Sequence, residues 1–231
     1  MVLKEIKESL LHLFFPHVCD GCGTDGLSID NCICLRCINE LPHTGFENLI
    51  DNPVEKIFWG RIDLNAATAQ FYFTKESLVQ RLMHELKYRG NKEIAIQLGR
   101  IMGEKLKRSG RFNVDTLVPL PLFPSREKKR GYNQATVICQ GISEQTGIPI
   151  LQDVISRPQP TATQTRKSRI DRWKNIEGKF QLEKPGAIEN KHLLLIDDVV
   201  TTGATLEACG SELLKGINTK LSIATLCFAY R

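Results

Sequence analysis

Short apolar runs alternate along the chain with stretches in which apolar residues recur every three or four positions. From residue 66 onward, the apolar runs predict strands at 66–73, 114–120, 148–155, 193–196 and 221–228. Apolar residues at helical spacing predict helices between them, at 78–89, 94–106, 132–145 and 206–214. Strands that alternate with helices in this way predict an α/β fold built on a parallel sheet.

Other segments do not fit this alternation. Residues 2–15 place apolar side chains on one face of a helix that we expect to pack on the neighbouring domain, a helix lying on a membrane being the alternative. Residues 41–65 show no dominant period and predict an irregular connection, in which Phe58 and Trp59 pack against the core. Residues 157–178 are polar and basic. A loop of about 20 residues in a compact domain is typical of a lid, and a surface insertion is the alternative.

The apolar run at 193–196 leads directly into polar residues. Asp197 and Asp198 come first, and two successive residues that leave a strand cannot both enter the core, so we expect their carboxylates to reach solvent or a ligand. The following residues offer free backbone N–H groups at a helix start, hydroxyl groups and a glycine. They are Val200, Thr201, Thr202, Gly203, Ala204 and Thr205. The pattern predicts a sugar phosphate site, whereas the alternative is a strand and helix whose Asp and Thr residues only cap the helix.

Basic residues gather in segments that can face this site. The net charge of +5 is modest, but residues 157–174 carry six basic residues against Asp171 alone. The segment after 114–120 is also basic, and in a parallel sheet it lies on the same rim as Asp197. We therefore expect an anionic ligand. The other candidate side chains are Lys87, Arg89, Arg126, Lys128, Lys129 and Arg130, of which Lys87 and Arg89 are equally well explained as solvated charges at a helix end.

Two Cys-x-x-Cys pairs predict a structural zinc site near the N-terminus. The ligands are Cys19, Cys22, Cys34 and Cys37, and four thiolates close a tetrahedral shell. Cys32 and His17 are weaker substitutes, and reduced cysteines without a metal are the alternative. Zinc would hold together a segment that is too small to fold alone. The expected organisation is a small four-cysteine zinc-ribbon domain at 1–45, followed by a second domain at 46–231.

Composition and sequence pattern argue against a membrane-spanning or secreted protein. A chain of 231 residues with 42% apolar and 25% charged residues is typical of a globular protein with one domain of ordinary size and a small appendage. It contains no apolar run long enough to span a membrane and no signal peptide pattern, so we expect a cytoplasmic protein. Cysteines stay reduced in that compartment, which favours metal ligands over disulfides.

Several short motifs follow one another along the chain in a specific order. After the cysteine pairs come the run Leu86-Lys87-Tyr88-Arg89-Gly90, the run Val118-Pro119-Leu120-Pro121, residues 129–135, residues 164–169, Asn175, Phe180 and residues 196–205. The last of these resembles the phosphoribosyl pyrophosphate (PRPP) signature of type I phosphoribosyltransferases. Together the motifs resemble the competence protein ComF family over nearly the whole chain. This resemblance implies a type I phosphoribosyltransferase-like parallel sheet with helices on both faces, preceded by a zinc-binding segment.

The resemblance also implies a role for each part of the site. Asp197 and Asp198 would contact the ribose, and residues 201–205 the 5-phosphate. The segment after Pro121 would correspond to the pyrophosphate loop. Residues 157–178 would form the flexible catalytic lid, with Arg169 and Arg172 as candidate catalytic residues, and Mg²⁺ would accompany PRPP.

Members of this family are implicated in natural transformation, in which single-stranded DNA is handled in the cytoplasm. The resemblance therefore implies a PRPP-binding protein that binds DNA directly or through a helicase-like DNA-uptake protein. One alternative is a phosphoribosyltransferase that transfers the ribose 5-phosphate of PRPP to an unidentified acceptor and releases pyrophosphate. Another is a zinc-ribbon protein whose second domain keeps the fold without a ligand. Glutamine hydrolysis is not expected, and no residue stands out as a base for an acceptor.

Overall fold

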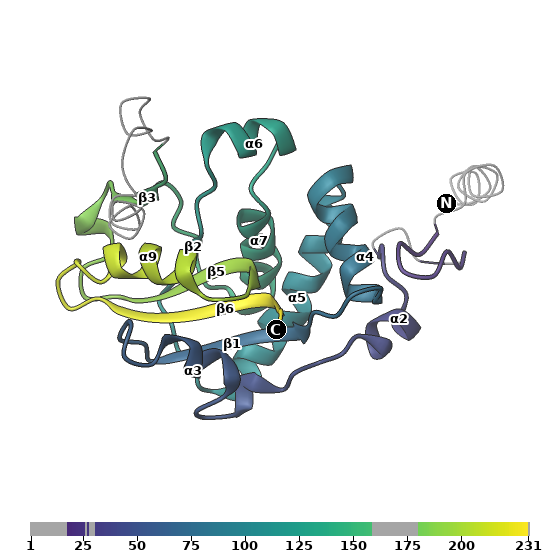
Figure 1. The fold of residues 1–231 in the computed structure, drawn as a ribbon, viewed down its shortest axis with the longest axis horizontal. Helices are drawn as coiled ribbons and strands as arrows, with labels where there is room; N and C mark the ends of the chain where they lie inside the picture. Colours follow the sequence, from purple (N-terminus) through teal and green to yellow (C-terminus); the bar gives the residue numbers. More distant parts are fainter. Residues whose placement is uncertain (1–17, 26, 28–30, 159–179, 231) are drawn as a thin grey trace, which may run out of the picture.

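A four-stranded parallel sheet forms the centre of the protein (Figure 1). The computed structural model describes residues 18–25, 27, 31–158 and 180–230. The strands lie in the order β1 (Ala66–Tyr72), β6 (Lys220–Phe228), β5 (His192–Val200) and β2 (Thr116–Pro119). Each neighbouring pair is parallel, which confirms the predicted sheet. The helix predicted at 2–15, His17, Arg169 and Arg172 lie outside the described residues.

Helices cover both faces of the sheet, as predicted. On one face, α4 (Leu78–His84), α5 (Lys92–Ser109) and α7 (Gln134–Thr146) share a buried core with Leu194 and Ile196 of β5. On the other face, α3 (Pro53–Phe58) and α9 (Ala204–Leu213) pack with the alternate residues Leu193 and Leu195. A strand that is buried on both faces is the arrangement expected of a parallel sheet, and it explains the continuous apolar run at 193–196.

The prediction of a strand at 148–155 is wrong. This segment makes a single parallel bridge, from Ile150 to Leu117, and the backbone of Asp153 then turns with φ of 56°. Only β3 (Ile155–Ser156) is extended further on, and it pairs antiparallel with β4 (Gln181–Leu182) in a separate small sheet. The turn at Asp153 ends the pairing on one side of this bridge, and Pro149 has no N–H group to extend it on the other.

The basic segment after β2 forms a short helix, α6 (Pro124–Arg130), and not the predicted loop. Proline at the first helical position has the backbone angle that a helix requires. Lys128, Lys129 and Arg130 occupy the last turn, where their positive charges complement the helix dipole. These basic residues therefore stabilise the C-terminus of α6 and also form a candidate ligand surface.

The connection predicted at 41–65 contains two short helical elements, η1 (Phe46–Asn48) and α3. Asn52 caps α3 by accepting hydrogen bonds from the N–H groups of Val54 and Glu55. Its side-chain amide also donates to the carbonyl of Ala67, at 2.8 Å, which ties α3 to β1. Phe58 is buried, as predicted, whereas Trp59 is 58% exposed and the prediction for it is wrong.

The cysteine-containing segment shares a buried core with α4 and with the turn that follows it. It includes α2 (Leu35–Glu40), and its buried residues Cys19, Ile33 and Cys37 belong to the same core cluster as Leu82 and Leu86. The π-helical turn η2 (Glu85–Arg89) joins α4 to α5, and η4 (Pro185–Ala187) precedes β5. In the part of the chain that the structure describes, no helix is long and apolar enough to cross a membrane.

Candidate functional site

Two adjacent carboxylates lie near the carboxyl end of β5. The strand continues past Ile196 to Val200, because Asp197 and Val200 remain in register with Thr225 and Phe228 of β6. The expectation that the chain leaves the strand at Asp197 is therefore wrong. Both aspartates are nevertheless only partly buried, as expected of side chains that reach a ligand site.

The environment of the two carboxylates differs. Lys87, from η2, places its ammonium group 2.8 Å from Oδ2 of Asp198. Asp197 accepts a hydrogen bond of 2.8 Å from the backbone N–H of Asp198. Burial, and secondly the charge of Asp198, raise the pKa of Asp197 well above its ordinary value. Lys87 thus compensates one carboxylate directly, while the other is held in an environment that disfavours its negative charge.

Residues 200–205, which we call the phosphate turn, follow the acidic pair and line a small cavity of about 60 Å³ together with Asp197, Val199 and Leu206. Helix α9 begins in this turn, and its N-cap Gly203 has no side chain to bond the first amides. The first N–H groups of a helix have no partner within the helix, so they are available to an anion. Thr201 and Thr202 are exposed and Thr205 is half-buried beside them.

Gly203 is required in the phosphate turn for two physical reasons. Its φ of 72° lies in the left-handed region that favours glycine. A Cβ atom at this position would also lie 2.7 Å from Cγ2 of Ile57 and 2.8 Å from Cε1 of Phe58. Helix α3 therefore packs directly against the phosphate turn and leaves no space for a side chain.

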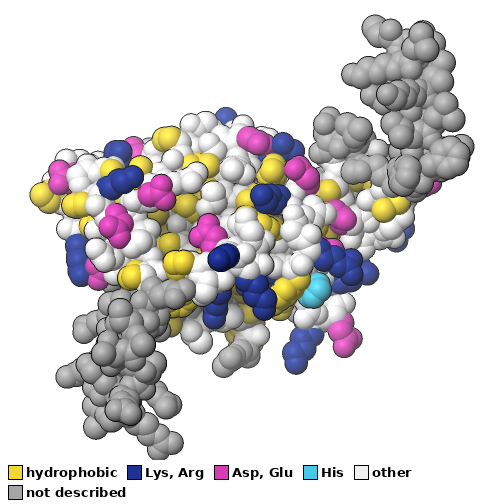
Figure 2. Space-filling view, turned by 90° about the horizontal axis from the view of Figure 1, so that it is seen from above, with side chains coloured by type: hydrophobic (Ala, Val, Ile, Leu, Met, Phe, Trp, Pro, Cys, Tyr) yellow, Lys and Arg dark blue, Asp and Glu magenta, His cyan; other side chains and the backbone are white. Residues whose placement is uncertain are grey.

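A second cavity, which we call the basic cavity, has a volume of about 300 Å³. Its lining is Lys87, Tyr88, Gly90, Arg126, Lys129 and Arg130. The structure thus brings η2 together with α6, and the ion pair of Lys87 with Asp198 connects the basic cavity to the acidic pair. Seen from above, Lys and Arg side chains are spread over the face shown in Figure 2, with Asp and Glu side chains among them.

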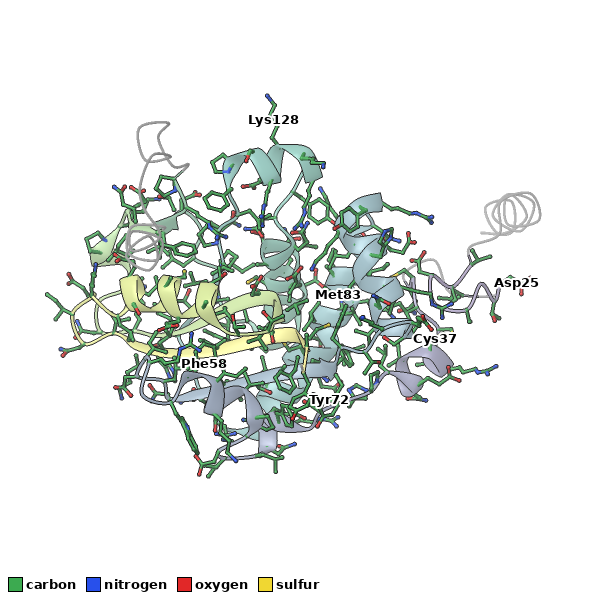
Figure 3. The ribbon with its side chains drawn as sticks, in the orientation of Figure 1. Asp25, Cys37, Phe58, Tyr72, Met83 and Lys128 are labelled. Atoms are coloured by element: carbon green, nitrogen blue, oxygen red, sulfur yellow. The ribbon has the colours of Figure 1, made fainter. Side chains whose placement is uncertain are left out.

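Two of the predicted basic residues do not line the basic cavity. Arg89 is paired with Glu85 at 3.1 Å, and its side chain is largely exposed. Lys128 points away from the body of the protein, on the outer side of α6 (Figure 3). Of the two interpretations of Lys87 and Arg89, a ligand-facing position therefore fits Lys87, and a solvated helix-end charge fits Arg89.

Arg157 belongs to this region, and sequence reasoning did not single it out within the basic segment at 157–174. Its guanidinium carbon lies 4.0 Å from the ring centre of Phe123 and 5.0 Å from that of Phe180. Its Nε atom is buried and has no hydrogen-bond partner within the described part of the chain. Burial lowers the pKa of Arg157, as does repulsion from Arg126, whereas attraction to Asp197 opposes this. The rings that hold Arg157 come from distant segments, which explains why no sequence signal marked it.

The four predicted cysteine ligands form one cluster. The sulfur atoms of Cys19, Cys22, Cys34 and Cys37 all lie within 4.8 Å of one another, so the cluster can hold a metal ion. The backbone N–H groups of Gly21 and Cys34 point at Sγ of Cys19, at 3.3 and 3.2 Å, which is the kind of support that thiolate ligands need. The donor set fits zinc.

Cys32, the predicted substitute ligand, has a different role. Its thiol and its backbone N–H both donate to Oε1 of Gln97, at 3.1 Å. Burial raises the pKa of the Cys32 thiol to about 12. Gln97 also accepts from the N–H of Ile33 and donates to its carbonyl, so one α5 side chain holds the segment between the cysteine pairs.

Residues 91–231 match the phosphoribosyl transferase domain family. The chain belongs to this family. It is also 32% identical to the DNA utilization protein YhgH of Salmonella typhimurium over 150 residues, which cover 63% of this chain and 65% of that protein. The chain thus spans 65% of the length of that relative.

The chain is also similar to a second curated protein and to a solved structure. Competence protein F of Haemophilus influenzae is 28% identical over 214 residues, or 92% of this chain and 82% of that protein, which confirms the predicted ComF family resemblance. Among solved structures, glutamine PRPP amidotransferase from B. subtilis, complexed with ADP and GMP, is 17% identical with a TM-score of 0.41. That match covers 57% of this chain and 25% of that chain.

Proposed function

We propose that this protein binds PRPP and acts in the uptake and handling of single-stranded DNA in the cytoplasm during natural transformation. One observation carries the proposal. Asp197 lines the cavity at the phosphate turn, and its neighbour Asp198 is joined to the basic cavity through Lys87. Carboxylates between two anion-binding regions match a ligand with a phosphate on each side of a polyhydroxyl sugar.

Each part of the site then has a role in holding PRPP. The carboxylates of Asp197 and Asp198 accept hydrogen bonds from the ribose hydroxyls, while residues 201–205 donate to the 5-phosphate. Lys87, Arg126 and Lys129 attract the diphosphate, and Arg157 adds a cation that has no competing acceptor at its Nε atom. Mg²⁺ would neutralise part of the diphosphate charge when it is bound with PRPP.

The DNA-related part of the proposal is supported by the relatives and by charge. One relative is named a DNA utilization protein and another competence protein F. Helix α6 presents Arg126, Lys128, Lys129 and Arg130, and basic side chains of this kind bind phosphates independently of sequence. We propose that single-stranded DNA is bound directly by α6, and that a helicase-like DNA-uptake protein acts on the same strand.

The second candidate function is phosphoribosyl transfer. The family match and the cations beside the acidic pair favour it. A nucleophile on an unidentified acceptor would form a bond to the anomeric carbon as the bond to the pyrophosphate oxygen breaks, and the bonding electrons would leave with pyrophosphate. Lys87, Arg126 and Arg157 would stabilise the leaving charge. Arg169 and Arg172 would contribute from the lid.

We further propose that the cysteine cluster holds a structural Zn²⁺ ion. All four ligand positions would be filled by protein, which leaves none for a substrate. The metal would stabilise the small domain at 1–45, beside a phosphoribosyltransferase-like domain at 46–231.

A calorimetric titration with PRPP and Mg²⁺ tests the proposed site. The wild type should bind, and the double variant Asp197→Ala/Asp198→Ala should bind much more weakly, because the hydroxyl acceptors are lost. Asp63→Ala, which removes an exposed carboxylate, is the matched control and should leave binding unchanged. An absence of PRPP binding by the folded wild type would contradict the proposal. Pyrophosphate release that depends on a candidate base or nucleotide would favour the second function.

DNA binding is tested separately by its dependence on salt. Single-stranded DNA affinity should fall steeply with salt if lysines and arginines contact the phosphates. Replacing the basic residues of α6 with alanine should weaken binding and reduce the salt dependence. The control removes as many exposed charges elsewhere, at Lys107, Arg108, Lys184 and Lys220. Equal losses in the two variants would show that α6 is not the DNA contact.

A further inference from the structure

Arg61 connects the segment after α3 to the phosphate turn. Its NH1 group donates to the carbonyl oxygens of Ile57 at 2.9 Å and of Thr202 at 2.8 Å. Its NH2 group is paired with the carboxylate of Glu207, which lies in the first turn of α9. One side chain thus contacts α3, the phosphate turn and the helix that the turn begins.

These contacts affect which backbone groups of the turn can meet an anion. A carbonyl oxygen repels a phosphate, whereas a backbone N–H binds it. The carbonyl of Thr202 immediately precedes Gly203, and glycine restricts the backbone least. Arg61 engages this carbonyl from outside the cavity, since it is not among the residues that line the cavity. The hydrogen bond therefore opposes a peptide rotation that would turn the oxygen towards the ligand.

We propose that Arg61 is a positioning residue, which fixes the phosphate turn so that its N–H groups face a sugar phosphate. The ligand class rests on the proposed function, but the effect on the turn does not. Packing of Ile57 and Phe58 against Gly203 limits the position of the turn from the same side. Arg61 adds the directional contact that packing lacks.

The proposal predicts a selective loss of affinity. Loss of a charge-assisted hydrogen bond weakens the interaction that it supports, and because this one is partly exposed we expect an effect of roughly tenfold. Arg61→Ala should bind PRPP and ribose 5-phosphate roughly tenfold more weakly. Pyrophosphate, which does not require the phosphate turn, should bind as it does to the wild type. The PRPP affinity of Arg61→Lys should lie between those of the wild type and Arg61→Ala, because an ammonium group cannot bridge all three acceptors.

Arg100→Ala is the matched control. Arg100 is paired with Glu144 between α5 and α7, with side chains that are 38% and 46% exposed, against 35% and 27% for Arg61 and Glu207. The control should leave all three affinities unchanged. A loss that is equal for PRPP and pyrophosphate in Arg61→Ala would overturn the proposal, because it would show a general effect on the fold.

Hydrogen exchange of the ligand-free protein tests the proposal independently of PRPP. Amides at 201–206 should exchange several-fold faster in Arg61→Ala than in Arg100→Ala, while those of β5 should be unaffected. Equal exchange in the two variants would overturn the positioning role. If the wild type failed to bind PRPP while this difference was present, the proposed function would be wrong and the role of Arg61 would stand. If Arg61→Ala did not fold, the same comparison would be made with Arg61→Lys.

Discussion

Substitution of Gly203 by alanine tests the packing of α3 against the phosphate turn. The new Cβ atom would lie 2.7 Å from Ile57 and 2.8 Å from Phe58, distances that require one of the groups to move. The backbone φ of 72° adds a second cost, since an L-residue disfavours the left-handed region by about 1–2 kcal/mol. Overpacking of a filled site costs about 1–3 kcal/mol. The free energy of unfolding should therefore fall by about 2–5 kcal/mol.

Gly147 provides a control that separates the two costs. It follows α7 with a φ of 76°, and a Cβ atom at this position would meet nothing within 4 Å. Gly147→Ala should thus show only the backbone cost, of about 1–2 kcal/mol. The difference between the two variants in denaturant unfolding isolates the contact with α3. It should be about 1–3 kcal/mol.

The same pair of variants separates stability from ligand binding. Gly203→Ala should weaken PRPP binding, because relief of the clash displaces the turn that holds the 5-phosphate. Gly147→Ala should leave the affinity unchanged, because it lies at the end of α7. If both variants lost the same stability, or if Gly203→Ala bound PRPP as the wild type does, the close packing of α3 under the phosphate turn would not exist as described.

Further predictions concern the metal, the acidic pair and the basic cavity. The purified protein should contain one equivalent of zinc by metal analysis, and Cys34→Ser should lose it while Cys32→Ser retains it; retention by both would contradict the assigned ligands. Since the pKa of Asp197 is raised in the folded state, the wild type should lose stability relative to Asp197→Asn as pH rises from about 4 through that raised pKa. A stability difference between the wild type and Asp197→Asn that does not change with pH would contradict this. Saturating PRPP should weaken single-stranded DNA binding several-fold in a competition titration, because the diphosphate and the DNA would share Lys129; additive binding would place the DNA elsewhere.

The sheet was predictable from sequence because its strands are buried on both faces. A residue run such as 193–196 has no polar position, and only a central parallel strand or a buried helix gives that pattern. The segment 148–155 is also mostly apolar, but it contains the polar residues Gln152 and Asp153, and the backbone turns at Asp153 with φ of 56°. Its pairing is limited to one bridge at Ile150, with Pro149 on one side and the turn at Asp153 on the other.

The parts of the site that a local sequence pattern marks were predicted, and those that depend only on contacts between distant segments were not. The phosphate turn is contiguous, so its residues appear together in the sequence. Arg157 depends on rings at Phe123 and Phe180, and Arg61 acts on a carbonyl 141 residues away. Contacts of this kind have no local pattern, because tertiary packing alone brings the groups together. The cysteine ligands were predicted across a longer gap because metal geometry fixes their spacing.

The cysteine cluster and the acidic pair are connected through α5 and η2. Gln97 of α5 holds the backbone around Cys32 and Ile33, and the amide of Asn91 at the start of α5 donates to the carboxylate of Asp20 at 2.8 Å. Lys87, which pairs with Asp198, lies only four residues before Asn91. A displacement of the cysteine segment would therefore also displace η2, which carries Lys87, the partner of Asp198. A metal in this cluster would stabilise the ligand site from a distance, without itself contacting the ligand.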